Sequence, residues 1–157
     1  MAESSDVRVL AVELRDFRTY ARAQAALGPG LTVVHGPNGA GKSNLLEALY
    51  FGCTARSPRT RNERELIRFD APVARVVVRC SDGAYEHELS VAYGAGPDGE
   101  RGVKRMVADG ASVERLLDVE FRPLLGVFEP DRLELIKGAP VARRAHLDQL
   151  VAGIWPL

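Results

Sequence analysis

The stretch GPNGAGKSNLLEAL, which begins at Gly36, constrains the fold more than any other part of this chain. It fits the pattern G-x-x-x-x-G-K-[ST], in which glycines let the main chain turn sharply and approach a phosphate group closely. Successive backbone N–H groups and the N-terminus of the following helix then face the anion. In such a loop Lys42 bridges the β- and γ-phosphates, and the Ser43 hydroxyl is a ligand of Mg²⁺. The sequence therefore predicts a site for ATP and Mg²⁺ formed by Gly36, Pro37, Asn38, Gly39, Ala40, Gly41, Lys42 and Ser43.

The segments on either side of this loop support the prediction. Residues 31–35, LTVVH, are a short apolar run that is typical of a strand covered on both faces. Residues 43–51, SNLLEALYF, contain no Gly or Pro and predict a helix. A strand before the loop and a helix after it disfavour the alternative, a glycine-rich turn followed by a chance Lys-Ser.

Several antiparallel hairpins are predicted in the rest of the chain. Residues 7–17, VRVLAVELRDF, alternate apolar and polar residues as a half-buried strand does, and RAQAAL is expected to pair back onto them. Asp82-Gly83 and Asp109-Gly110 are strong signals for two further hairpin turns. The predicted class is therefore α/β with a mixed layout and an antiparallel part, rather than a regular βαβ series.

The C-terminal third predicts shorter elements. We expect a short helix near 113–118, a second buried strand at LLGVF (124–128) and a last helix over 140–152 that begins at Pro140. The basic segment that follows the phosphate-loop helix is expected to run into another short helix.

Composition limits the function classes. Lys plus Arg equals Asp plus Glu, 21 of each, so any surface for nucleic acid must be local. Cys53 and Cys80 have no metal-ligand spacing, which favours reduced thiols in a cytoplasmic protein. The three histidines, His35, His87 and His146, show no metal spacing either, and no apolar run approaches the length of a membrane span.

The sequence of the phosphate loop and its position in the chain indicate one class of nucleotide-binding proteins. Small phosphate-loop kinases usually begin almost directly with the strand before the loop, whereas here a predicted hairpin comes first. The chain resembles the ATPase heads of the ABC and SMC superfamily, and more closely the N-terminal half of the RecF family. The matching motifs are DFRTY (16–20), LGPGLTVVHGPNGAGKSNLLEALY (27–50), ARSPRT (55–60), ELIRF (65–69) and VFEPDRLELIKGAPVARRAHLD (127–148).

This resemblance implies an ATP-binding protein of DNA repair and replication that binds single-stranded DNA and gapped duplexes. RecF proteins work with RecR and RecO to place recombinase on DNA and to support the SOS response. They dimerise when ATP lies between two heads, so ATP acts as a switch. The resemblance also places Arg18 near the nucleotide base. The pattern departs from the family at Thr19, Ala55, Pro58, Glu129, Asp131 and Arg132. The glutamine that such heads commonly use as a sensor is missing between 121 and 133, and Gly126 lies near its expected position.

Two parts of a complete ATPase head are not found in the sequence. The Walker B site needs four apolar residues followed by Asp-Glu; LLGVFEP ends in Glu129 instead, and we interpret it as a strand that reaches solvent. VVVRCSD fails as a Walker B site too, because Asp82 belongs to a hairpin turn. The signature loop needs L-S-G-G, and ELSVAY has the Leu-Ser but lacks the glycines. We therefore expect residues 1–157 to be the N-terminal lobe of a head, to bind ATP weakly and to hydrolyse it hardly at all, with no catalytic residue assigned.

Two groups of arginines have alternative interpretations. Arg56, Arg59, Arg61 and Arg64 could contact DNA or a nucleotide across a dimer, or form a solvated loop balanced by Glu63 and Glu65. Arg143 and Arg144, near His146 and Asp148, are better explained as a helix surface with local ion pairs.

Two other functions remain as alternatives. A head from another SMC-type protein would be followed by a coiled coil, which Pro156 interrupts. A small-molecule kinase would need a lid for the phosphate acceptor, and the hairpin-rich middle predicts none.

Overall fold

The computed structural model describes residues 7–96 and 102–127 and the helical positions 140–141, 143–144 and 147–148. The chain divides into two compact units, Met1–Pro123 and Leu124–Leu157. The first unit contains the sheet and the phosphate-loop helix.

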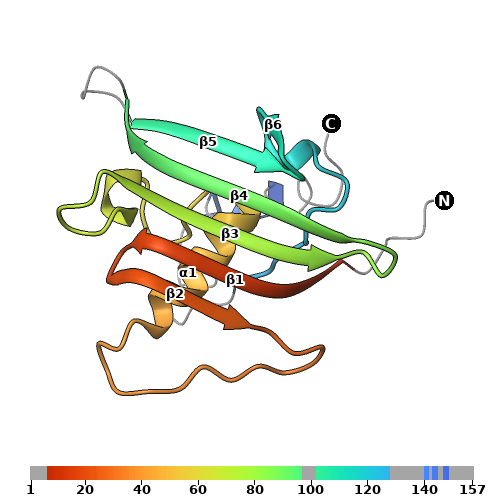
Figure 1. The fold of residues 1–157 in the computed structure, drawn as a ribbon, viewed down its shortest axis with the longest axis horizontal. Coiled ribbons are helices and arrows are strands. Elements are labelled where there is room, and N and C mark those ends of the chain that lie inside the picture. Colours follow the sequence, from red (N-terminus) through yellow and green to blue (C-terminus); the bar gives the residue numbers. More distant parts are fainter. Residues whose placement is uncertain (1–6, 97–101, 128–139, 142, 145–146, 149–157) are drawn as a thin grey trace. The chain divides into compact units, whose positions relative to one another are not determined.

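A six-stranded antiparallel sheet with the order β2-β1-β3-β4-β5-β6 forms the framework of the first unit (Figure 1). The three predicted hairpins are confirmed as β1–β2, β3–β4 and β5–β6. Asp-Gly turns join the last two pairs, and Gly83 and Gly110 have positive φ angles of 95° and 81°. The strands are β1 (Arg8–Phe17), β2 (Tyr20–Ala26), β3 (Val73–Ser81), β4 (Glu86–Ala95), β5 (Gly102–Ala108) and β6 (Ala111–Val113).

One helix, α1 (Lys42–Thr54), packs across one face of this sheet against β3, β1 and β4 (Figure 1). The alternating side chains of β3 that face it, such as Val76 and Val78, are fully buried. Gly52 allows the close approach, because a Cβ there would lie 2.5 Å from Cγ2 of Val78. The rings of Phe17 and Phe51 complete the contact, with their centroids 5.9 Å apart.

The two short helices predicted from the sequence are 3₁₀ turns, η1 (Glu63–Leu66) and η2 (Leu116–Asp118). Lys104 of β5 connects η1 to the end of α1. Its Nζ donates to the carbonyl oxygen of Ala55 at 2.6 Å and also pairs with Glu63. A cation at this position is favourable because the last carbonyls of a helix carry partial negative charge.

The predicted buried strand at residues 31–35 is wrong. The segment is not a strand, and the side chains of Leu31 and Val33 are 93% and 70% exposed. A strand needs neighbours for its N–H and C=O groups, and none of the described strands pairs with this segment. Apolar composition alone therefore did not determine its structure.

The second predicted buried strand, 124–128, is wrong for the same reason over its described part. Residues 124–127 form no strand and Leu124 is 55% exposed. Residue 128 lies outside the described residues.

The last helix, predicted over 140–152, is confirmed at the described positions 140–141, 143–144 and 147–148. Glu129 and the rest of that region lie outside the described residues. Within the part of the chain that the structure describes, no helix is long and apolar enough to cross a membrane.

Candidate nucleotide-binding site

The phosphate loop, residues 36–43, turns back on itself and opens α1. Gly39 and Gly41 have φ angles of 83° and 93°, in the left-handed region that favours glycine. The N–H of Ala40 donates to the carbonyl oxygen of Pro37 at 3.2 Å, and the N–H of Leu45 donates to that of Gly41 at 3.0 Å, which begins the helix. The loop therefore has a compact turn next to a helix N-terminus, as an anion site requires.

The Lys42 amine is directed back over this loop. Its Nζ donates to the carbonyl oxygens of Gly36 at 2.9 Å and Pro37 at 2.8 Å. Ser43 is exposed in the first turn of α1. Among the described residues, no group of three or more His, Cys, Asp or Glu could hold a metal ion. If Mg²⁺ binds together with a nucleotide, the Ser43 hydroxyl could supply one ligand, with phosphate oxygens and water among the others.

The β1–β2 turn packs against the loop. The Tyr20 hydroxyl donates to the carbonyl oxygen of Gly41 at 3.2 Å, and the Asn44 amide donates to Oγ1 of Thr19 at 3.0 Å. A Cβ on Gly41 would lie 3.0 Å from the Tyr20 hydroxyl oxygen. Both the φ angle of Gly41 and the small space beside Tyr20 favour glycine at this position. The DFRTY motif therefore packs directly against the phosphate loop.

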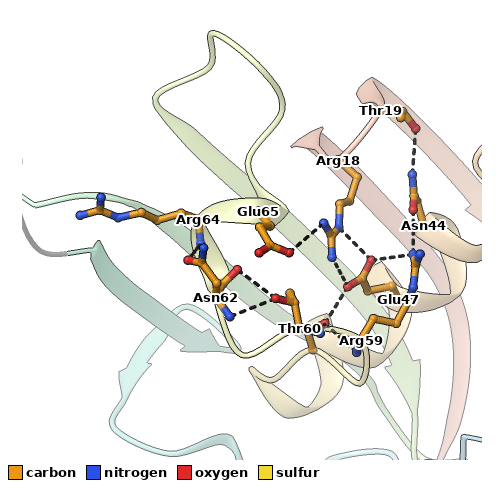
Figure 2. Close-up of polar contacts among 10 residues, drawn as sticks. Arg18, Thr19, Asn44, Glu47, Arg59, Thr60, Asn62, Arg64 and Glu65 are labelled. Carbon is orange, nitrogen blue, oxygen red and sulfur yellow. Dashed lines mark hydrogen bonds and ion pairs between the residues drawn. The ribbon is translucent and has the colours of Figure 1, made fainter.

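A buried carboxylate, Glu47, lies one turn along α1 and joins three segments of the chain (Figure 2). Arg18, in the β1–β2 turn, donates to it from Nε at 2.9 Å and from Nη2 at 2.8 Å. From the basic loop, the Ser57 hydroxyl donates at 2.6 Å and Nη1 of Arg59 at 3.2 Å. Glu47 therefore holds two arginines beside the helix that carries the phosphate loop.

The partners of Glu47 keep it ionised. Burial alone would raise its pKa, but the hydrogen bonds from Arg18 and Ser57 and the charges of Arg18 and Arg59 outweigh burial and lower it. Sequence analysis did not find this residue. The available signal was its position on the helix face that Ala48 and Phe51 bury, where an acidic residue needs a partner.

Arg18 is held by the protein itself. Its backbone, with φ 52°, donates to the carbonyl oxygen of Leu66 at 2.7 Å, and its guanidinium also lies 3.8 Å from Glu65. The resemblance to RecF implies a position near a nucleotide base. In the structure, the Arg18 guanidinium makes a bidentate contact with Glu47.

All four arginines of the basic loop are exposed, and Arg59 also contacts the phosphate-loop helix. Nη1 of Arg59 donates to Oδ1 of Asn44 at 3.0 Å as well as to Glu47 (Figure 2). Arg56, Arg61 and Arg64 are exposed, and the N–H of Arg64 donates to the Asn62 side chain. Arg59 thus serves the fold, whereas roles for Arg56 and Arg61 in binding remain predictions.

The structure also describes several of the other predicted candidates. His35 is exposed and not in a strand, so its prediction as a strand-end residue is wrong. Arg143 and Arg144 occupy exposed helical positions, and His146 lies outside the described residues. Ser90 of the ELSVAY segment is buried within β4.

Both cysteines are free and buried, as the sequence predicted for reduced thiols. Burial raises the pKa of Cys53 to about 12. Burial, together with the nearby carboxylates of Asp109 and Asp82, raises that of Cys80 to about 11. These thiols remain protonated at neutral pH.

His87, for which the sequence indicated no metal site, joins two hairpin turns. Its Nδ1 lies 2.7 Å from Oδ2 of Asp109 and its Nε2 3.4 Å from Oδ2 of Asp82. Its ring stacks on Phe121 with the centroids 3.9 Å apart. The hydrogen bond to Asp109 raises the pKa of His87 despite burial, and Asp82 adds to this effect.

Comparisons with known proteins agree with this geometry. The sequence matches the family described as an AAA domain over residues 11–116, more than half of the chain. The chain belongs to this family. The match begins within β1 and includes the phosphate loop, α1 and the hairpins.

Curated relatives confirm the resemblance to RecF. The chain is 37% identical over 154 residues to the DNA replication and repair protein RecF of Chloroflexus aurantiacus and 39% identical over 160 residues to that of Roseiflexus castenholzii. Each match covers 91% of this chain and 39% of the relative. The chain therefore spans about two fifths of the length of these relatives.

Solved structures confirm the predicted fold class, the N-terminal half of an ABC/SMC-type head. A structure of the recombination mediator protein RecF with ATP matches with a TM-score of 0.82 and 26% identity, over 98% of this chain and 40% of that one. A structure from work on SMC ATPases matches with a TM-score of 0.68 and 24% identity, over 94% of this chain and 99% of that one. The second likeness concerns the fold alone.

Proposed function

We propose that the chain is the N-terminal lobe of a RecF-type ATPase head that binds ATP and Mg²⁺ at residues 36–43 and acts in DNA repair. The position of the Lys42 amine, held over the loop by the carbonyl oxygens of Gly36 and Pro37, is the observation that carries this proposal. The ATP-bound RecF structure that the chain resembles supports the choice of nucleotide. The middle of the chain forms β3–β6 rather than a lid, which disfavours a small-molecule kinase.

The finer roles rest on the resemblance to RecF. They are binding to single-stranded and gapped duplex DNA, cooperation with RecR and RecO, recombinase loading, support of the SOS response and a cytoplasmic location. A homodimer that closes on ATP belongs to the same proposal and concerns the complete protein.

Hydrolysis is expected to be slow. The Leu-Ser pair that most resembles a signature loop lies within β4, where Ser90 is buried and cannot approach a nucleotide on a second head. In this proposal residues 36–43 bind the nucleotide, and no residue of the chain is assigned to catalysis.

The test is ATP binding by Lys42→Ala, measured by isothermal titration calorimetry with Mg²⁺. A charge-assisted hydrogen bond contributes about 1.5–3 kcal/mol, so affinity should fall roughly 10- to 150-fold. Arg115→Ala, which removes an exposed cation beside η2, is the control and should bind ATP as the unaltered chain does. Equal affinity of Lys42→Ala and the control would contradict the proposed site.

A further inference from the structure

A row of arginines crosses the sheet on the face that α1 does not cover. The strand register places Arg22 of β2 opposite Arg15 of β1, Arg15 opposite Arg75 of β3, Arg75 opposite Ala92 of β4, and Ala92 opposite Arg105 of β5. Side chains alternate between the two faces of a strand, and the neighbours of Arg75 along β3 are buried on the α1 side. All four arginines are exposed and share the opposite face.

No carboxylate in this row balances these charges. Arg75 donates from Nε to the Ser90 hydroxyl at 3.1 Å, and within the described residues none of the four arginines forms an ion pair. The neighbouring acid on β1, Glu13, accepts instead from Gln24 at 3.2 Å. Like charges directly opposite each other destabilise a sheet. The row therefore costs stability, and an anionic partner would remove that cost.

Several arginines outside the row do have carboxylate partners. Arg18 and Arg59 contact Glu47, and Arg68 contacts Asp16 at 2.8 Å. The row differs from these three arginines because its four guanidinium groups have no carboxylate partner among the described residues. An open hollow beside the row is lined by Arg15, Arg22 and Arg75. Its lining also includes the acidic residues Glu13, Asp16 and Glu88, of which Asp16 is already paired with Arg68.

The chemistry of the row fits one kind of anion. Guanidinium groups bind phosphates through two parallel hydrogen bonds. Strands lie about 4.8 Å apart, so the four strand spacings from β2 to β5 span roughly 19 Å, or about five to six base pairs at 3.4 Å each. The row and the adjacent row of Gln24, Glu13, Val77, Ser90 and Val107 contain no aromatic side chain on which an unpaired base could stack. This composition suits a duplex backbone better than a single strand.

We propose that the arginine row Arg22–Arg15–Arg75–Arg105 binds the phosphate backbone of duplex DNA. The proposal rests on the proposed function in DNA repair and assigns the duplex part of it to this sheet face rather than to the basic loop. Because the contacts are with phosphates, binding is independent of base sequence.

The test uses the full chain with ATP and a fluorescent duplex, with affinity measured by anisotropy over a range of salt concentrations. The variant combines Arg15→Gln, Arg22→Gln and Arg105→Gln and keeps Arg75, which contacts Ser90. Each lost phosphate contact lowers the slope of log affinity against log salt by about 0.9, so the slope should fall by roughly 2 to 3 and low-salt affinity by at least about tenfold. The melting temperature should stay the same or rise, since repulsion within the sheet is relieved.

The matched control removes three exposed arginines elsewhere, with Arg56→Gln, Arg61→Gln and Arg115→Gln. The proposal predicts a clearly smaller effect in this variant. Equal losses in the two variants would show that binding follows total charge, and a loss in the control alone would place the DNA at the basic loop; either result overturns the proposal. Unchanged DNA affinity in the row variant with an altered oligomeric state would show that the row contacts protein.

Failure of the row and failure of the proposed function remain distinguishable. Calorimetry of ATP binding is run on the same preparations. If ATP and duplex bind but the row variant is unaffected, only the arginine row is refuted. If the chain binds ATP and no duplex under any salt condition, the row is refuted together with the duplex-binding part of the proposed function, while the nucleotide site stands.

Discussion

Glu47→Gln is the substitution that most directly tests how the phosphate-loop helix is held. Glutamine has nearly the same shape, but it carries no charge and its amide group would face the donors of Arg18, Ser57 and Arg59. The Glu47 side chain is fully buried, whereas 19% of the Arg18 side chain and 41% of that of Arg59 are exposed. The change therefore removes the acidic partner of a group of cations that water can only partly reach.

The expected cost follows from this geometry. Breaking a buried ion pair by removing one partner costs about 3–5 kcal/mol. Because both arginines can be partly rehydrated, we expect a loss of about 2–3 kcal/mol in the free energy of unfolding at neutral pH. For a chain of this size that corresponds to a melting temperature lower by roughly 5–10 °C, measurable by circular dichroism together with urea unfolding.

The effect also has a defined pH dependence. The pKa of Glu47 is lowered in the folded protein, so its stabilisation is complete above the ordinary value of 4.5 and is lost as the pH falls through the lowered value. The difference between the unaltered chain and Glu47→Gln should therefore be constant near neutral pH and shrink in acid.

Glu65→Gln is the matched control, because Glu65 also faces Arg18 but is 51% exposed and lies 3.8 Å away. Its removal should cost at most about 1 kcal/mol. If both substitutions lowered stability equally, or if the difference at Glu47 persisted in acid, Glu47 would not be the charged centre that joins these segments.

Two further predictions concern groups away from the phosphate loop. Iodoacetamide at about pH 8 should alkylate Cys53 and Cys80 far more slowly in the native chain than in urea, because only thiolates react and both pKa values are raised. Mass spectrometry measures the two alkylation rates, and similar rates in the native and unfolded chain would contradict the burial of these thiols. His87→Gln should reduce the free energy of unfolding more at about pH 5.5 than at about pH 8.5, since a raised histidine pKa stabilises the fold below 6.5 and this contribution is lost as the pH rises through the raised value. Urea unfolding at both pH values measures the difference, and an equal loss at each would refute the role of the Asp82 and Asp109 contacts.

Local patterns were read correctly from the sequence. Alternation of apolar and polar residues predicted β1, and Asp-Gly turns predicted the hairpins, because both signals lie within a few residues of the structure that they determine. The glycine spacing of the phosphate loop is local in the same sense. Residues 31–35 and 124–128 were misjudged because a strand also depends on partners from elsewhere in the chain.

The candidate site also combines a feature set by neighbouring residues with contacts between residues far apart in the sequence. The loop could be predicted, but the role of Glu47 depends on Arg18, which is 29 positions away, and on residues 10 and 12 positions beyond it. Arg59 was expected to face solvent, DNA or a second nucleotide site, and the structure adds a contact with the buried carboxylate that the sequence did not predict. The arginine row likewise becomes visible only when the strand register is known.

The contact between the Lys42 amine and the carbonyl oxygens of Gly36 and Pro37 has a consequence for the energetics of the proposed triphosphate binding. A long cationic side chain that is already immobilised loses little rotamer freedom when a ligand arrives, a saving of about 0.5–1.5 kcal/mol. Folding thus supplies part of the preorganisation that recognition needs. Affinity should consequently respond to substitutions that loosen the backbone at 36 and 37, even where every direct phosphate contact is retained.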